Sequence, residues 1–209
     1  MARTLRLLRD AAQFAGVILG GVLSRRSVRP RGDEARRPLP GDDFIPAAKA
    51  RWTNGITIRA TPPDVWPWLA QMGCRRGGWY SYDALDNGGA PSAARIVPSW
   101  QSVTVGDVFP WTPIARDGFI VRAVDPARSL VLGGGDPRSR YSVTWSFVLE
   151  PIDATRTRLV TRASGDYSRR STGLFLKVVW HPVHFAMQRR QLRNLKCRVE
   201  ANTAGRNNG

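Results

Sequence analysis

Residues 77–87 read GGWYSYDALDN and place Trp79, Tyr80 and Tyr82 close together, with Asp83 directly behind them. Such side chains can line a binding pocket, because the rings offer apolar faces and the hydroxyls offer hydrogen bonds. If these rings were core instead, both hydroxyls would still need partners inside the protein. We therefore expect a pocket wall, with a core role as the alternative. Asp83 could anchor a ligand, cap a helix or pair with an arginine such as Arg162, and the structural roles are favoured.

His181 and His184 are the two histidines of the chain. The run HPVH lacks the HExxH spacing of zinc enzymes, and no nearby acid or thiol offers a third ligand. We therefore expect no metal site and no cofactor. If a reaction occurs, His181 or His184 would carry protons near neutral pH, with Tyr82 and Asp83 as further catalytic candidates. In a binding protein His181 would hydrogen-bond within the cavity beside Phe185, or be a satisfied core residue.

Trp145, Phe147 and Arg162 fall on neighbouring predicted strands, at positions that could face a helix. An arginine inside a cavity would bind a carboxylate or phosphate group, whereas the alternative is an outward surface arginine. Other chemistries find no support. There is no GxSxG motif, and GGGDP at residues 133–137 lacks the Lys and Ser or Thr of a phosphate-binding loop, so it is interpreted as a hairpin turn.

The elements that must position these residues form an α+β pattern. Apolar alternation and turn residues predict a strand, two short helices, a run of antiparallel strands and a long C-terminal helix with an inward apolar stripe. Thr61 is expected to cap the first helix, and Pro182 to bend the last one. The expected helices cover residues 61–73, 81–87 and 171–202. The expected strands cover residues 51–60, both sides of the turn at 106–107, the two arms of a hairpin over 118–134, residues 141–152 and residues 158–164.

A curved sheet around one long helix cannot close completely on that helix. The space between them would be a cavity that opens near the two short helices. This arrangement places residues 77–87 at the mouth of the cavity.

Several segments together resemble the START-like (SRPBCC) superfamily, and more narrowly its actinobacterial polyketide cyclase/dehydrase-like branch of uncharacterised proteins. The resemblance extends over about residues 37–200. It implies a helix-grip fold with a cavity for apolar or amphipathic small molecules, and it implies no particular reaction. The matching segments are RPLPGDDFIP, ITIRATPPDVWPWLAQMG, RRGGWYSYDALDN, ARIVPSWQ, VGDVF, TWSFVLEP and HPVHFAMQRRQLRNLK.

The formal charge of +16 is concentrated at the two ends of the chain. Residues 1–37 carry a net charge of +6 and residues 169–209 a net charge of +8, which leaves +2 for residues 38–168. Such ends suggest an anionic partner, either phospholipid or nucleic acid, although solvated basic faces explain them equally well. Cys74 and Cys197 give no disulfide framework, which fits a reducing cytoplasm.

The N-terminal segment separates from the body of the chain. Residues 1–26 are expected to form a basic apolar helix that lies in a membrane interface, with docking on the domain or a short membrane span as alternatives. Residues 27–46 are rich in Pro and Arg and are interpreted as a linker. The START-like domain is then expected over residues 47–203, followed by a disordered tail over residues 204–209.

The sequence therefore predicts a cytoplasmic protein that binds a lipid, polyketide or isoprenoid-like molecule, peripheral to the inner face of the membrane. The alternative function is a polyketide cyclase or aromatase-type enzyme that uses the same cavity. Nucleic-acid binding is not favoured, because no recognised motif accompanies the charge. The oligomeric state stays open. The expected ligand-binding residues are Trp79, Tyr80, Tyr82, Trp100, Trp145, Phe147, Arg162, His181, His184 and Phe185.

Overall fold

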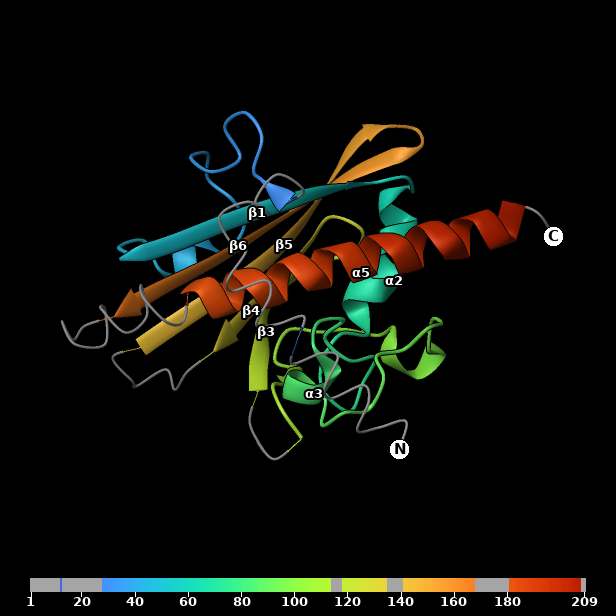
Figure 1. The fold of residues 1–209 in the computed structure, drawn as a ribbon. Coiled ribbons are helices and arrows are strands. Elements are labelled where there is room, and N and C mark those ends of the chain that lie inside the picture. The colour runs from blue at the N-terminus through green and yellow to red at the C-terminus, as the bar shows by residue number, and fades with distance from the viewer. Residues whose placement is uncertain (1–11, 13–27, 114–117, 135–140, 168–180, 208–209) are drawn as a thin grey trace.

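The computed structural model describes Ala12 and residues 28–113, 118–134, 141–167 and 181–207 (Figure 1). The predicted N-terminal helix lies outside the described residues apart from Ala12. The helices are η2 (Asp42–Phe44), α2 (Pro62–Ala70), α3 (Asp83–Asp86), η3 (Pro98–Trp100) and α5 (His181–Asn207). The strands are β1 (Ala50–Ile58), β2 (Val108–Pro110), β3 (Gly118–Asp125), β4 (Ser129–Gly134), β5 (Tyr141–Asp153) and β6 (Arg156–Tyr167).

The strands form one 6-stranded sheet in the order β1-β6-β5-β4-β3-β2, and every neighbouring pair is antiparallel. The strands from β2 to β6 follow one another as a meander, and β1 then pairs with the last strand, β6. The long helix α5 crosses one face of the sheet, which we call the inner face (Figure 1). A curved antiparallel sheet held against a C-terminal helix is the predicted α+β helix-grip fold, and this prediction is confirmed.

Strand alternation divides the sheet residues between the two faces. On the inner face Ile56 lies opposite Leu159, and Leu159 lies opposite Leu149 on β5. These side chains pack with α2 and with Leu192 and Leu195 of α5 into the main core. The inner face is therefore the side on which an apolar ligand could meet the protein interior.

Helix α2 begins where the sequence predicts. The Asp64 carboxylate accepts hydrogen bonds from the Thr61 hydroxyl (2.7 Å) and from its backbone N–H (3.4 Å), and Pro62 needs no N–H partner in the first turn. Val65, Trp68 and Leu69 point into the core. The helix ends at Ala70, which delivers the chain to the loop that carries Trp79.

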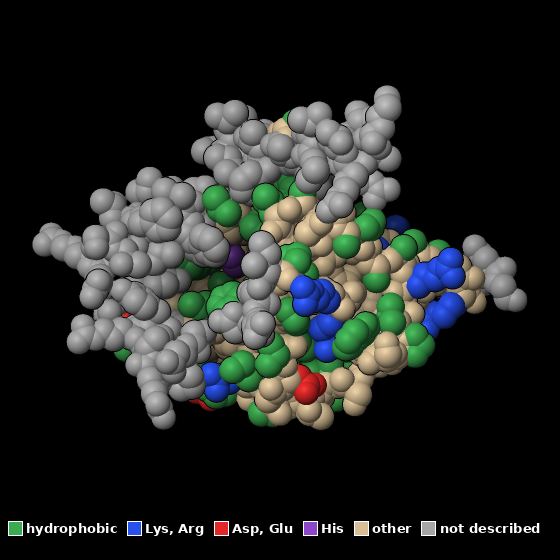
Figure 2. Space-filling view, turned by 90° about the horizontal axis from the view of Figure 1, so that it is seen from below, with side chains coloured by type: hydrophobic (Ala, Val, Ile, Leu, Met, Phe, Trp, Pro, Cys, Tyr) green, Lys and Arg blue, Asp and Glu red, His purple; other side chains and the backbone are tan. Residues whose placement is uncertain are grey.

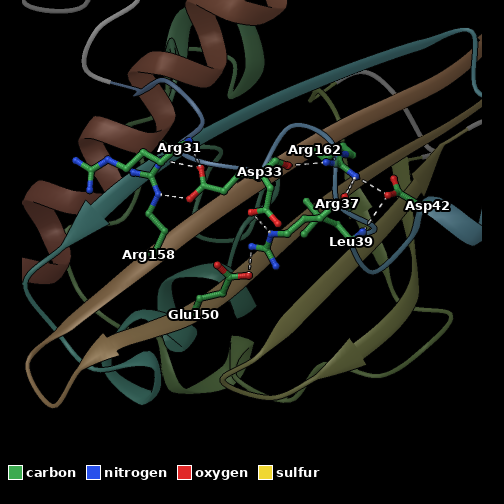
Figure 3. A network of polar contacts seen from close by, with 9 residues as sticks. Arg31, Asp33, Arg37, Leu39, Asp42, Glu150, Arg158 and Arg162 are labelled. Atoms are coloured by element: carbon green, nitrogen blue, oxygen red, sulfur yellow. Dashed lines mark hydrogen bonds and ion pairs between the residues drawn. The ribbon is translucent and has the colours of Figure 1, made fainter.

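Residues 29–46 lie against the outer face of the sheet, which differs from the predicted linker, and Val28 before them is buried in the main core. Arg158 on β6 donates hydrogen bonds of 2.8 and 2.9 Å to the two oxygens of Glu34, and Arg162 pairs with Asp42 (Figure 3). Leu39 packs with Val148 and Val160 in a small second core. The charged residues of this segment instead supply ion-pair partners for charges that project from the sheet: Glu34 for Arg158, Asp42 for Arg162 and Arg37 for Glu150.

Two other expectations need correction. No strand forms before the turn at Gly106, because residues 101–105 pair with no neighbouring strand and only β2 follows the turn. Helix α5 continues to Asn207, so residues 204–207 are helical where a disordered tail was expected. The first part of the predicted long helix, residues 171–180, lies outside the described residues.

Candidate ligand-binding site

The candidate site is a group of aromatic rings from separate elements that meet on the inner face. Trp79 stacks on Trp145 of β5 with ring centroids 5.5 Å apart and an interplanar angle of 20°. Phe119 of β3 lies 5.7 Å from Trp79 and 5.6 Å from Trp145. His184 of α5 lies 5.8 Å from Trp145 and 6.1 Å from Trp52 of β1. We call Trp52, Trp79, Phe119, Trp145 and His184 the aromatic site.

Strand register explains why Trp52 and Trp145 come together. Trp52 lies opposite Ala163 of β6, and Ala163 lies opposite Trp145. Paired residues share a face, so the two indoles flank a side chain that is only a methyl group. In the adjacent row Asn54, Thr161 and Phe147 are paired in the same way, with their side chains on the same inner face.

Most rings of the aromatic site are only half-buried. Trp52, Phe119, Trp145 and His184 are of intermediate exposure, whereas Trp79 is buried. Figure 2 shows a face of the molecule on which a histidine side chain is visible among hydrophobic side chains. Half-buried rings at the margin of a core can accept further apolar contact, which fully covered rings cannot.

A chain of buried hydrogen bonds fixes the rings from the helix side. Trp145 Nε1 donates to Gln188 Oε1 (2.8 Å), and Gln188 Nε2 donates to Gln191 Oε1 (2.7 Å). Gln191 Nε2 then donates to the backbone oxygen of Trp79 (2.9 Å). Both glutamines are almost fully buried on α5, so these hydrogen bonds link the sheet, the helix and the loop in a fixed arrangement.

The glycines ahead of Trp79 have a steric reason. Gly78 has φ +80°, and a Cβ there would collide with Ser92. The Ser92 hydroxyl accepts a 3.0 Å hydrogen bond from the Tyr80 N–H and donates one of 2.5 Å to Asp83. The Trp79 indole N–H donates to the backbone oxygen of Pro110 at 3.0 Å. This bonding makes the loop a rigid support for Trp79.

Tyr80 and Tyr82 lie apart from the aromatic site. Tyr80 is buried against Trp68, its hydroxyl accepts a 2.7 Å hydrogen bond from Gln71 Nε2, and burial raises the pKa of Tyr80 to about 12. Tyr82 is buried beneath the guanidinium of Arg190, which lies 4.3 Å from the ring. The structure therefore brings only Trp79 from this loop to the site.

Asp83 and Trp100 also lie elsewhere. Asp83 accepts hydrogen bonds from the hydroxyl and the N–H of Ser92, which is a structural role, and Arg162 is not its partner. The guanidinium of Arg76 lies 4.6 Å from the centre of the Trp100 ring and 4.4 Å from the centre of the Phe109 ring. Trp100 therefore packs on Arg76 and is not part of the aromatic site.

The expectation that Arg162 faces the helix with Trp145 and Phe147 is wrong. Arg162 lies opposite Ser146 on β5 and therefore points to the outer face. There its guanidinium donates to Thr53 Oγ1 (3.0 Å) and to the backbone oxygens of Arg37 and Glu34 (3.0 and 2.7 Å). Residues 28–46 cover this arginine, so it cannot bind a ligand on the inner face.

The remaining predicted residues divide into core and site. Phe147 is fully buried in the core and touches Trp145 at 4.8 Å, while Phe185 is half-buried against the same core. His184 belongs to the aromatic site. The backbone of His181 forms the described start of α5, and its side chain lies outside the described part of the structure.

Sequence reasoning missed Trp52, Phe119 and the buried acid Asp86. The first two become visible only once strand pairing is known, because both sit outside the quoted motifs. Asp86 is the last residue of α3 and is 6% exposed. Its burial, together with the nearby Asp83, raises the pKa of its carboxyl to about 7. The Ser81 hydroxyl and the charge of Arg190 lower the pKa of Asp86, but by less than burial raises it.

Within residues 28–113, 118–134, 141–167 and 181–207, no group of three or more His, Cys, Asp or Glu side chains is placed to hold a metal ion. None of the helices described there combines the length and the apolar character that crossing a membrane requires.

No protein-family model and no curated protein matches the chain. Solved structures with a similar fold include a hypothetical protein from Helicobacter pylori. Its sequence is 13% identical, the alignment covers 80% of this chain and 97% of the other chain, and the TM-score is 0.49. Another is the di-domain ARO/CYC BexL, 14% identical, covering 72% of this chain and 46% of its own, with a TM-score of 0.42. A Mycobacterium smegmatis protein is 15% identical, covers 73% and 92%, and has a TM-score of 0.44.

Proposed function

We propose that this protein binds a small, mostly apolar molecule at the aromatic site, between the inner face of the sheet and α5. The observation that carries the proposal is that Trp52 and Trp145 flank the small residue Ala163, with His184 in contact with both indoles. These three rings remain half-buried beside a fully buried core. A ligand that covered them would gain apolar contact at about 25 cal/mol for each Å² removed from water.

Binding fits the described residues better than catalysis does. Asp83 is held by Ser92, and Tyr82 lies beneath Arg190, so neither proton carrier meets His184 at the aromatic site. The family we propose for the chain is the polyketide cyclase/dehydrase-like branch of START-like proteins, and the ligand class is a lipid, polyketide or isoprenoid-like compound.

Fluorescence of the neutral apolar dye N-phenyl-1-naphthylamine tests this function. We expect saturable binding to the full chain, weakened at least tenfold by Trp52→Ala, because this half-buried ring would be lost from one side of the site. Trp100→Ala is the matched control, since Trp100 contacts Arg76 instead, and it should bind the dye as the unchanged protein does. Absence of dye binding to the full chain, or equal weakening by both variants, would reject the proposed site.

We further propose peripheral association with an anionic membrane, carried by the basic ends of the chain. Residues 1–37 have a net charge of +6, and Arg193 projects from an exposed position on α5. Figure 2 shows Lys and Arg side chains on one face of the molecule. Vesicles that contain phosphatidylserine should bind the full chain in a salt-dependent manner, since such attraction decays within a Debye length of about 8 Å at physiological ionic strength. Flotation that is unaffected by deletion of residues 1–26 would contradict the N-terminal contribution.

A further inference from the structure

Thr161 is a buried hydroxyl without a partner. Its residue is 1% exposed, and no described residue forms a hydrogen bond with its Oγ1. An unsatisfied buried polar group costs about 1–3 kcal/mol, so most protein interiors avoid it. Thr157, four residues earlier on the same face, shows the usual solution: its hydroxyl donates a 2.7 Å hydrogen bond to the backbone oxygen of Ala60.

Asn54 lies directly opposite Thr161 and likewise has no hydrogen-bond partner among the described residues. It is 7% exposed on the inner face of β1, and its side-chain amide forms no hydrogen bond with another described residue. Two adjacent polar side chains on neighbouring strands are therefore directed at the inner face, and neither forms a hydrogen bond with a described residue there. Together they offer donors and acceptors, because an amide and a hydroxyl each provide both.

This pair adjoins the aromatic site. Asn54 and Thr161 occupy the row next to Trp52 and Ala163, on the same face and the same two strands. A molecule that packs against the indoles would thus have the two polar side chains one row deeper, about 7 Å away, which is the spacing of alternate residues on a strand.

The described strand residues around the pair carry no charge on the inner face. Among the described residues of β1, β5 and β6 that share this face, the side chains are apolar or neutral: Trp52, Asn54, Ile56, Ile58, Val143, Trp145, Phe147, Leu149, Thr157, Leu159, Thr161 and Ala163. The charges of these strands, such as Arg158, Arg162 and Glu150, belong to the outer face. An ionised ligand group would have no counter-charge on these strands and would lose its hydration.

We propose that Asn54 and Thr161 form the polar end of the aromatic site and select ligands with an uncharged hydroxyl or carbonyl group on an apolar body. The inference rests on the ligand-binding function proposed above, and it adds the chemistry of the ligand's polar group. Thr161 and Asn54 act as specificity-determining residues, and Trp52 and Trp145 supply most of the apolar contact.

Displacement of N-phenyl-1-naphthylamine by a matched set of compounds tests this inference. The set is naphthalene, 2-naphthol and 2-naphthoate, which share one apolar body and differ in having no polar group, a neutral hydroxyl or a carboxylate. The full chain should bind 2-naphthol roughly three- to tenfold more tightly than naphthalene, the gain expected from one net hydrogen bond. The charged 2-naphthoate should be the weakest ligand.

Variants assign the preference to the pair. Thr161→Val removes the hydroxyl without a change of shape and should bring the ratio of the two affinities to about one, and Asn54→Leu should lower it. Thr144→Val is the control, because Thr144 is also buried on β5 but points to the outer face opposite Ser164. It should leave the ratio unchanged.

The outcomes separate this inference from the function on which it rests. If all three compounds displace the dye but no variant changes their order, the site binds ligands and the polar pair is satisfied by water, which overturns the inference alone. Preference for 2-naphthoate would overturn the assignment of a neutral group. If the full chain binds neither dye nor compounds, the proposed function falls together with the inference.

Discussion

Trp145 of β5 donates its indole N–H to Oε1 of Gln188 on α5 across 2.8 Å, so the helix fixes the ring at the centre of the aromatic site. Gln188 also donates a hydrogen bond to Gln191, and Gln191 donates one to the backbone oxygen of Trp79. The two stacked indoles, which come from a strand and a loop far apart in the sequence, are thus positioned by one helix face.

Gln188→Leu should destabilise the protein. It leaves the Trp145 N–H and the Gln191 oxygen without partners in a buried region, and we expect the free energy of unfolding to fall by about 2–3 kcal/mol. Urea denaturation followed by far-UV circular dichroism measures the change. Adding Trp145→Phe to this variant should recover part of the loss, because one unpaired donor is removed. A single variant as stable as the unchanged protein would show that the hydrogen-bond chain does not stabilise the fold.

The ion pair between Arg158 and Glu34 should contribute strongly to stability. Its side chains are only 6% and 9% exposed, so Glu34→Gln would leave a buried cation without its counter-charge. We expect a loss of about 3 kcal/mol in the free energy of unfolding. The pair of Arg37 with Asp33 has side chains 31% and 70% exposed, and Asp33→Asn should cost less than about 1 kcal/mol. Equal effects of the two variants in thermal unfolding would contradict this ranking.

Asp86 should make stability depend on pH. Burial raises the pKa of its carboxyl from 3.8 to about 7, so the folded protein holds a proton that the unfolded chain releases. The contribution of Asp86 to stability is therefore fully present below pH 3.8, decreases as the pH rises toward 7, and is flat above that.

Asp86→Asn should remove this decline. The variant should match the unchanged protein near pH 4 and exceed it at pH 8, by up to about 4 kcal/mol if the whole shift is expressed. Asp83→Asn is a poor substitute for this test, because Asp83 holds Ser92. Urea midpoints at several pH values measure the difference, and a difference that does not grow with pH would show that Asp86 is already ionised in the folded state.

Thr161→Val should stabilise the ligand-free protein while it weakens the preference for hydroxylated ligands. Its buried hydroxyl has no described partner, so the exchange removes an unsatisfied group and should add about 1 kcal/mol to the free energy of unfolding. Thr157→Val is the matched control on the same strand face. It breaks the bond to Ala60 and should lower stability by about 1 kcal/mol. Destabilisation by both variants would indicate that Thr161 is satisfied in solution.

The sequence contained enough information for the fold. Alternation predicted the strands, apart from the one expected before Gly106. The run TPPD predicted the start of α2 at Thr61, and the apolar stripe predicted that α5 faces the sheet. These features depend on local periodicity and capping, which a single sequence displays.

The candidate site was predicted only in part, because it depends on pairing between distant segments. Trp79, Trp145 and His184 were chosen for their type and lie together in the structure, whereas Trp52 joins them only through the register of β1 with β6. Arg162 was placed on the wrong face, since alternation along one strand does not say which set of residues points inward. Its partners, Asp42 and the backbone of residues 34–37, lie in a segment whose composition suggested no packing at all.

The packing of residues 28–46 changes how anything attached to the N-terminus is mechanically coupled to the domain. A flexible segment of this length would let its two ends separate by about 25 Å and would leave the domain free to rotate. Instead Val28 is fully buried in the main core, and the following residues are pinned by Glu34, Leu39 and Asp42. The described part of the chain therefore begins at a residue that the core fixes, so the attachment point at Val28 does not move relative to the sheet.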